Sequence, residues 1–97
     1  MEPRKTIAVD VDGTLLLKGG GRNEAVIAWL RTQHARGYKL FLWSARGEDH
    51  ARAAAEFCGV TSLFCAILEK PGYILDDHGW NWVRFTGIIR SLVTPLP

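Results

Sequence analysis

The sequence predicts a single α/β domain built on a central, mostly parallel β-sheet of about five strands. Short apolar runs alternate with longer segments of helical spacing along the 97 residues, and this alternation is typical of a parallel sheet covered by helices. Hydrophobic residues make up 47% of the chain and charged residues 23%, as is ordinary for a globular protein. No repeat, low-complexity tract or linker divides the chain, so we expect one domain over residues 1–97.

The expected elements follow one another with short connections. Helices are expected at residues 23–36, which Asn23 would cap and Gly37 would end, and at the alanine-rich residues 48–58. Residues 88–93 are expected to add one or two helical turns. The glycine-rich residues 16–22 are expected to form a flexible hairpin or flap over the strand ends. The strands are short runs of apolar and aromatic residues, expected at 6–9, 38–43, 63–68, 73–75 and 82–85.

Charge and composition exclude several classes of protein. The formal net charge is +2 and no block of Lys and Arg exists, so no groove that would follow a nucleic-acid backbone is evident. The longest apolar runs are too short to span a membrane, and no signal peptide is visible. Cys58 and Cys65 lack metal-ligand spacing and have apolar neighbours, so we expect buried free thiols in a reducing compartment. The sequence therefore predicts a soluble cytoplasmic protein.

Polar side chains are expected to gather at one edge of the predicted sheet. The first strand runs into Asp10, the second ends on Ser44, and the fourth runs into Asp76 and Asp77. In open α/β sheets, ligands bind beyond the carboxyl ends of the strands. Neighbouring strands lie about 4.8 Å apart, so these groups would meet within about one substrate's width. Asp12 follows Asp10 by two residues and would point the same way in an extended chain.

These residue types predict phosphoryl chemistry that is assisted by a metal ion. The carboxylates of Asp10, Asp76 and Asp77 form a hard oxygen environment that suits Mg²⁺ better than zinc. The metal would neutralise charge on a phosphoryl group. Asp10 is a candidate nucleophile because a carboxylate can attack phosphorus and form an acyl phosphate. Asp12 would protonate the leaving oxygen and later deprotonate water. Ser44 would donate its hydroxyl to a phosphoryl oxygen.

Three motifs, in order along the chain, make the sequence resemble the haloacid dehalogenase superfamily of phosphohydrolases. The first is an apolar strand followed by D-x-D-G-T at residues 7–14 (IAVDVDGT), the second a strand that ends in Ser at 40–47 (LFLWSARG), and the last a strand that ends in paired acids at 73–77 (YILDD). The resemblance spans most of the chain. It implies a three-layer Rossmann-like fold and a phosphatase that acts through an aspartyl-phosphate.

The resemblance also implies a role for each matched residue. Asp10 would be the nucleophile and a Mg²⁺ ligand, and Asp12 the general acid/base, lending its backbone carbonyl to the metal. Ser44 would bind the phosphoryl group, and Asp76 with Asp77 would complete the metal site. Many members carry a cap domain inserted after the first motif or after the second helix, whereas this chain has neither insert and resembles the capless class. Such an open site admits a macromolecular substrate or is closed by a neighbouring subunit of a homo-oligomer, and the sequence leaves both open.

The positive side of the pocket has two candidates, Lys70 and Arg46. Lys70 is the only Lys between the second and last motifs, and it precedes Asp76 by six residues. If that stretch were extended it would span about 20 Å and would place Lys70 near the opposite edge of the sheet, unless Gly72 breaks the strand. Arg46 stands two residues beyond Ser44, and a guanidinium fork suits phosphate oxygens. The sequence therefore leaves the phosphate-binding cation open between the two.

Two other functions compete with a Mg²⁺-dependent phosphatase. A signalling receiver also combines acids, Mg²⁺ and an aspartyl-phosphate, but it places the acidic pair first and the accepting Asp later, which is the reverse of the order here. A catalytically weak binding or assembly module is favoured by the doubtful Lys70, and the intact acids argue against it. The phosphorylated substrate stays open among sugar phosphates, nucleotides, lipid precursors and nucleic-acid ends.

Overall fold

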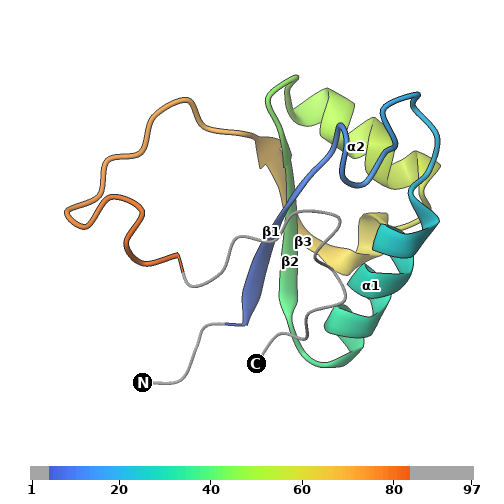
Figure 1. The fold of residues 1–97 in the computed structure, drawn as a ribbon, viewed down its shortest axis with the longest axis horizontal. Coiled ribbons are helices and arrows are strands. Elements are labelled where there is room, and N and C mark those ends of the chain that lie inside the picture. Colours follow the sequence, from blue (N-terminus) through green and yellow to red (C-terminus); the bar gives the residue numbers. More distant parts are fainter. Residues whose placement is uncertain (1–4, 84–97) are drawn as a thin grey trace.

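The computed structural model describes residues 5–83, and this part of the chain is a small α/β unit (Figure 1). The two helices and three strands expected before residue 70 are each found within a residue or two of the expected ends. In chain order the elements are β1 (Thr6–Asp10), α1 (Glu24–Ala35), β2 (Lys39–Ser44), α2 (Glu48–Phe57), the 3-10 turn η1 (Thr61–Leu63) and β3 (Phe64–Glu69).

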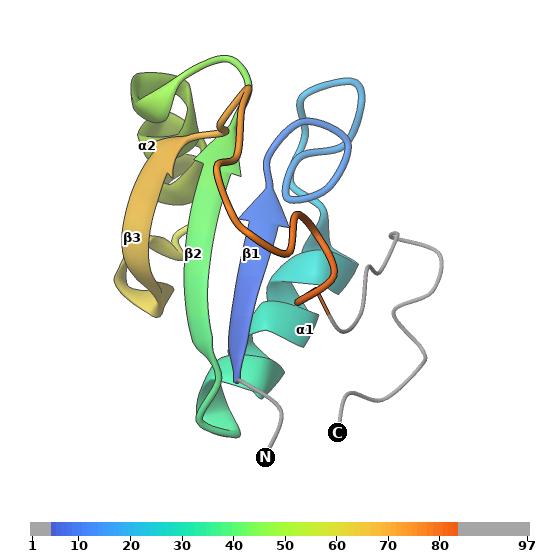
Figure 2. The same cartoon turned by 90° about the vertical axis from the view of Figure 1, so that its left-hand side faces the viewer.

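The three strands of the described chain form one parallel sheet in the order β1-β2-β3. Asp10 is paired with Trp43, and Ser44 with Glu69, so all three strands end at the same edge. Helices α1 and α2 connect consecutive strands and both lie on one face of this sheet (Figure 2). The predicted parallel α/β architecture is confirmed at this level.

The core lies between the sheet and the two helices. Leu40 and Leu42 of β2 are fully buried and face the helices, and Leu30 of α1 is equally buried. The matching face of α2 consists of alanines, whose small side chains allow the helix to lie close to the sheet. The buried set that packs in this layer is Val9, Val26, Ile27, Leu30, Leu40, Leu42, Ala51, Ala54 and Ala55.

The start of α1 and the two cysteines test the local predictions. The Asn23 side chain accepts a hydrogen bond from the Val26 amide at 3.4 Å, which confirms the predicted N-cap. Cys58 is a buried free thiol, as expected, whereas Cys65 is exposed. Cys65 lies at a register shift in β3, because Phe64 pairs with β2 residue Leu40 and the next pairing already involves Ala66. A residue at such a bulge lacks a partner on the neighbouring strand, so Cys65 does not enter the core.

The other face of the sheet carries a second apolar surface. Since Leu40, Leu42 and Ser44 face the helices, Phe41 and Trp43 project from the opposite face. Both are half-buried, and their rings meet edge to face with centroids 5.3 Å apart. Within residues 5–83 both helices cover the other side (Figures 1 and 2). The described chain is therefore a two-layer unit, and a third layer is not found in it.

The prediction of a fourth strand at residues 73–75 is wrong for this structure. Residues 70–83 form an irregular segment that leaves the carboxyl end of β3 (Figure 2), and Tyr73 and Leu75 are 97% and 104% exposed. A parallel neighbour would have to begin at the amino edge of the sheet, and returning there takes a crossover of about a dozen residues. Only Lys70, Pro71 and Gly72 separate β3 from Tyr73. The chain is therefore too short at this point to start another parallel strand.

The rest of the carboxyl-terminal prediction is tested only in part. Trp82 and Val83 belong to no strand, and the remainder of the expected strand at 82–85 lies outside the described residues. The helical turns expected at 88–93 lie outside them as well. In the described part, neither helix has the length and apolar character needed to cross a membrane.

Candidate functional site

The ends of the three strands bring Asp10, Ser44 and Lys70 to one edge of the sheet. Asp10 is the last residue of β1 and Ser44 the last of β2. Lys70 follows β3 directly, and its amide donates a hydrogen bond to the Ser44 carbonyl at 2.9 Å. The extended arrangement that would have carried Lys70 to the opposite edge is therefore wrong, because residues between Lys70 and Asp76 do not form a strand.

A tight loop after β1 presents Asp12 at this edge. Val11 and Leu15 are fully buried and anchor both sides of the loop. The amides of Leu15 and Leu16 donate to the carbonyls of Asp10 and Val11 at 3.3 and 3.0 Å, and close the turn. Gly13 has φ +81°, a conformation that side chains rarely adopt. The loop thus buries its apolar residues and leaves the Asp12 side chain exposed beyond β1.

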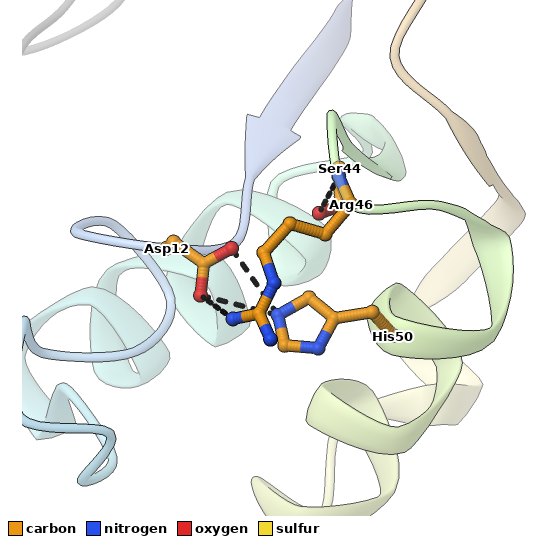
Figure 3. Close-up of polar contacts among 4 residues, drawn as sticks. All are labelled: Asp12, Ser44, Arg46 and His50. Atoms are coloured by element: carbon orange, nitrogen blue, oxygen red, sulfur yellow. Dashed lines mark hydrogen bonds and ion pairs between the residues drawn. The ribbon is translucent and has the colours of Figure 1, made fainter.

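The Asp12 carboxylate contacts two cationic or ionisable side chains from the segment that follows β2 (Figure 3). Arg46 places Nη1 3.4 Å from Oδ1. His50 places Nε2 3.1 Å from Oδ1 and 3.2 Å from Oδ2. Sequence reasoning proposed Arg46 as a phosphate ligand but assigned no role to His50, so it missed this contact. The signal in the sequence that could have indicated His50 was its place near the start of the helix that follows Ser44.

Ser44 organises the loop that leads into α2. Its side chain is almost fully buried, with 1% of the residue exposed, and Oγ accepts a hydrogen bond from the Arg46 amide at 3.0 Å. Its carbonyl accepts bonds from the amides of Gly47 and Lys70. Gly47 has φ +107° and is the residue from which α2 starts. Ser44 therefore connects the end of β2 with both the helix α2 and the residue after β3.

A hollow of about 440 Å³ lies beside Asp12. Arg46 and His50 form one wall, and residues of the predicted flap, including Leu17 and Lys18, form the other. The flap is a hairpin, closed by a bridge between Leu16 and Arg22 and by two backbone hydrogen bonds between Leu17 and the glycines. Three basic or ionisable groups and one carboxylate thus surround the hollow. Asp10, Ser44 and Lys70 are not among the residues that line it.

Asp76 and Asp77 lie on the exposed segment 70–83, where they interact with His78. The His78 amide donates to Asp76 Oδ1 at 2.8 Å, and His78 Nδ1 lies 3.0 Å from Asp77 Oδ1. One ligand atom from each residue falls within 4.8 Å of the others, a spacing that could hold a metal ion. Figure 1 shows that the segment 70–83, which carries these acids, swings out from the sheet on the side away from the helices. The structure therefore brings together part of the predicted site and keeps the paired acids apart from it.

Comparison of this chain with protein-family models, with curated proteins and with solved structures finds no match.

Proposed function

We propose that this protein is a Mg²⁺-dependent phosphatase that hydrolyses phosphomonoesters through an aspartyl-phosphate on Asp10. The observation that carries the proposal is the position of Asp10, Ser44 and Lys70 at the carboxyl ends of three neighbouring parallel strands, with Asp12 on the adjoining loop. Ligands of open α/β sheets bind at this edge. The residue types there are a nucleophile, a hydroxyl donor, a cation and a second carboxylate, which are the parts that phosphoryl transfer through an acyl phosphate needs.

The chemistry divides between the two aspartates. A carboxylate oxygen of Asp10 attacks phosphorus, the bond to the leaving oxygen breaks, and Asp12 gives that oxygen its proton. Asp12 then accepts a proton from water as the water attacks the phosphorus of the acyl phosphate, and this step releases inorganic phosphate and the free Asp10 carboxylate. The Ser44 hydroxyl and the cations of Lys70 and Arg46 hold the phosphoryl oxygens. When bound, Mg²⁺ neutralises part of the phosphoryl charge.

The donor set suits the proposed metal ion in its chemistry. Asp10 and the Asp12 carbonyl offer hard oxygen ligands at the sheet edge, and Asp76 and Asp77 offer two more carboxylates. The six steps along the chain from Lys70 to Asp76 can span about 20 Å. Two strand spacings, from β3 to β1, amount to about 10 Å. The segment is therefore long enough to carry the paired acids to the edge next to Asp10 without forming a strand.

The proposal includes the larger, three-layer fold that the sequence predicts. Phe41 and Trp43 leave an apolar surface on the face away from the helices, and parallel sheets are usually covered on both faces. A second layer of covering structure would complete the sheet as a three-layer, capless domain with an open site. Such a site accepts a phosphorylated small molecule or the phosphorylated end of a macromolecule, or it is closed by a second copy of the chain.

The test is release of inorganic phosphate from p-nitrophenyl phosphate and β-glycerophosphate, with Mg²⁺ and with excess chelator. We expect turnover that requires Mg²⁺ and is abolished by Asp10→Asn. Asp49→Asn is a matched control, because Asp49 is an exposed aspartate on α2, and it should retain wild-type activity. Phosphate release that Asp10→Asn leaves unchanged would show that the assigned nucleophile is wrong.

A second candidate function is a binding or assembly module without turnover. It is favoured by the course of segment 70–83, which carries Asp76 and Asp77 out from the sheet (Figure 1), and by the apolar face that carries Phe41 and Trp43. Beryllofluoride distinguishes the two functions because it mimics a phosphoryl group on a carboxylate. The phosphatase should bind it at Asp10 together with Mg²⁺, with shifts of the backbone NMR signals around β1. Failure of the mimic and the metal to bind together would favour the module.

A further inference from the structure

The shortest polar contact of the Asp12 carboxylate is with His50. The imidazole Nε2 lies within 3.2 Å of both carboxylate oxygens, whereas Arg46 reaches only Oδ1, at 3.4 Å. The His50 side chain is 26% exposed and the Arg46 side chain 66%. Water and salt weaken contacts of exposed groups most strongly. His50 is therefore the partner better placed to hold the orientation of Asp12.

The position of His50 follows from the way α2 begins. The helix starts at Glu48, directly after Gly47, and His50 is one residue before Ala51, which is fully buried. His50 therefore lies at the border of the buried face, turned toward the loop that carries Asp12 (Figure 3). Glu48, two residues earlier, instead pairs with Arg52 at 3.0 Å on the exposed side of the helix.

From these contacts we infer that His50 is a positioning residue that aims Asp12 for proton transfer. The inference rests on the proposed function, in which Asp12 must give a proton to the leaving oxygen and then take one from water. A nitrogen that carries hydrogen donates to the carboxylate, and Nε2 is the ring nitrogen that faces it. Catalytic geometry is demanding, since a displacement of about 1 Å can reduce the rate about 100-fold. His50 acts through Asp12 and need not touch the substrate.

The role predicts a dependence on the leaving group. p-Nitrophenolate leaves readily without a proton, whereas the alkoxide of β-glycerophosphate requires one. We expect His50→Ala to lower kcat/KM for β-glycerophosphate by about 10- to 100-fold, which is part of the roughly 100- to 10,000-fold that general acid–base catalysis contributes, and to lower it for p-nitrophenyl phosphate far less. His50→Gln should restore much of the loss, because its side-chain amide N–H can donate from a similar position. His34→Ala serves as the control, since His34 is an exposed histidine on α1.

A second measurement tests the contact without turnover. Long-range ¹H–¹⁵N NMR spectra report the hydrogen on each ring nitrogen of a histidine. In the wild type we expect hydrogen on Nε2 of His50, and Asp12→Asn should shift that nitrogen signal while leaving the signals of His34 unchanged. Thermal melting of each variant confirms that it is folded before its kinetics are compared.

The outcomes separate failure of this inference from failure of the proposed function. Three outcomes overturn the positioning role alone, provided that turnover depends on Asp10. They are equal losses of kcat/KM on both substrates in His50→Ala, no loss in His50→Ala, and a His50 nitrogen signal that Asp12→Asn does not shift. Absence of any Asp10-dependent turnover overturns the proposed function and the role together. A leaving-group-dependent loss, with rescue by Gln and a coupled NMR shift, supports both.

Discussion

Replacing Ser44 with alanine should destabilise the fold by a small and predictable amount. Ser44 Oγ accepts one hydrogen bond, from the Arg46 amide at 3.0 Å. The bond is only partly buried, so water can replace Oγ as the partner of the Arg46 amide. The relevant cost is therefore the net value of one hydrogen bond, about 1 kcal/mol, and not the larger penalty of a buried amide left without a partner.

That free energy converts into a measurable change in melting temperature. For a domain of this length, about 1 kcal/mol lowers Tm by about 4–8 °C. Circular dichroism melts of the wild type and Ser44→Ala would give the shift, with Ser62→Ala as the control, because Ser62 is exposed on η1. The control should change stability by less than about 0.5 kcal/mol.

The same substitution should also reduce phosphatase activity, and the free energy lost from transition-state binding should exceed the free energy lost from folding. A hydrogen bond to a charged phosphoryl oxygen is worth about 1.5–3 kcal/mol, which corresponds to a loss of about 10- to 150-fold in kcat/KM. The assay is run well below the melting temperature of the variant, so that the folded fraction is unchanged. A Tm equal to that of Ser62→Ala would refute the hydrogen-bond reasoning. A lower Tm with undiminished kcat/KM would refute the assignment of Ser44 to the phosphoryl group.

Two further substitutions test the backbone and the buried thiol. Gly47→Ala should lower the free energy of unfolding by about 1–3 kcal/mol through the φ of +107° alone, because the added Cβ would lie 3.8 Å from the nearest atom and would not clash. Urea unfolding measures the loss. Gly72→Ala is the control and should cost much less, because Gly72 has no positive φ and has open space around it. Burial raises the pKa of the Cys58 thiol, with a smaller opposing effect from Arg22. The thiol of the unfolded chain therefore ionises at a lower pH than the thiol of the folded chain. The free energy of unfolding is unaffected below the ordinary thiol pKa, and it falls as the pH rises from that pKa to the raised pKa of the folded protein. The free energy of unfolding should fall more between pH 7 and pH 10 in the wild type than in Cys58→Ala, and equal falls would contradict this origin.

The local pattern of the sequence was sufficient to predict the helices and strands between residues 5 and 69. Apolar runs and boundary residues such as Asn23 and Gly37 placed both helices and three strands within a residue or two of their ends. Such signals are local, since caps and periodicity act over a few residues. They also placed Asp10 and Ser44 at strand ends, and the parallel pairing that follows from α/β alternation put these ends at one edge.

The same local signals gave a wrong prediction at residues 73–75, where the composition is typical of a strand but the preceding connection is too short for one. Residues 73–75 are apolar and aromatic, but their place three residues after β3 leaves no crossover for a parallel neighbour. Lys70 was judged by its distance from Asp76 along an assumed strand, whereas its position depends on where β3 ends. The hydrogen bond between Lys70 and Ser44 shows that the end of β3 determines which edge Lys70 occupies.

By itself, then, the sequence determined which residues between 5 and 69 form helices and strands, and which chemical groups stand at the strand ends. Only the tertiary structure decided that Lys70 lies beside Ser44, that one face of the sheet holds both helices, and that His50 meets Asp12. The last contact joins residues 38 positions apart. Its existence depends on how α2 lies against the loop after β1, and packing between distant elements, which no local pattern encodes, sets that arrangement.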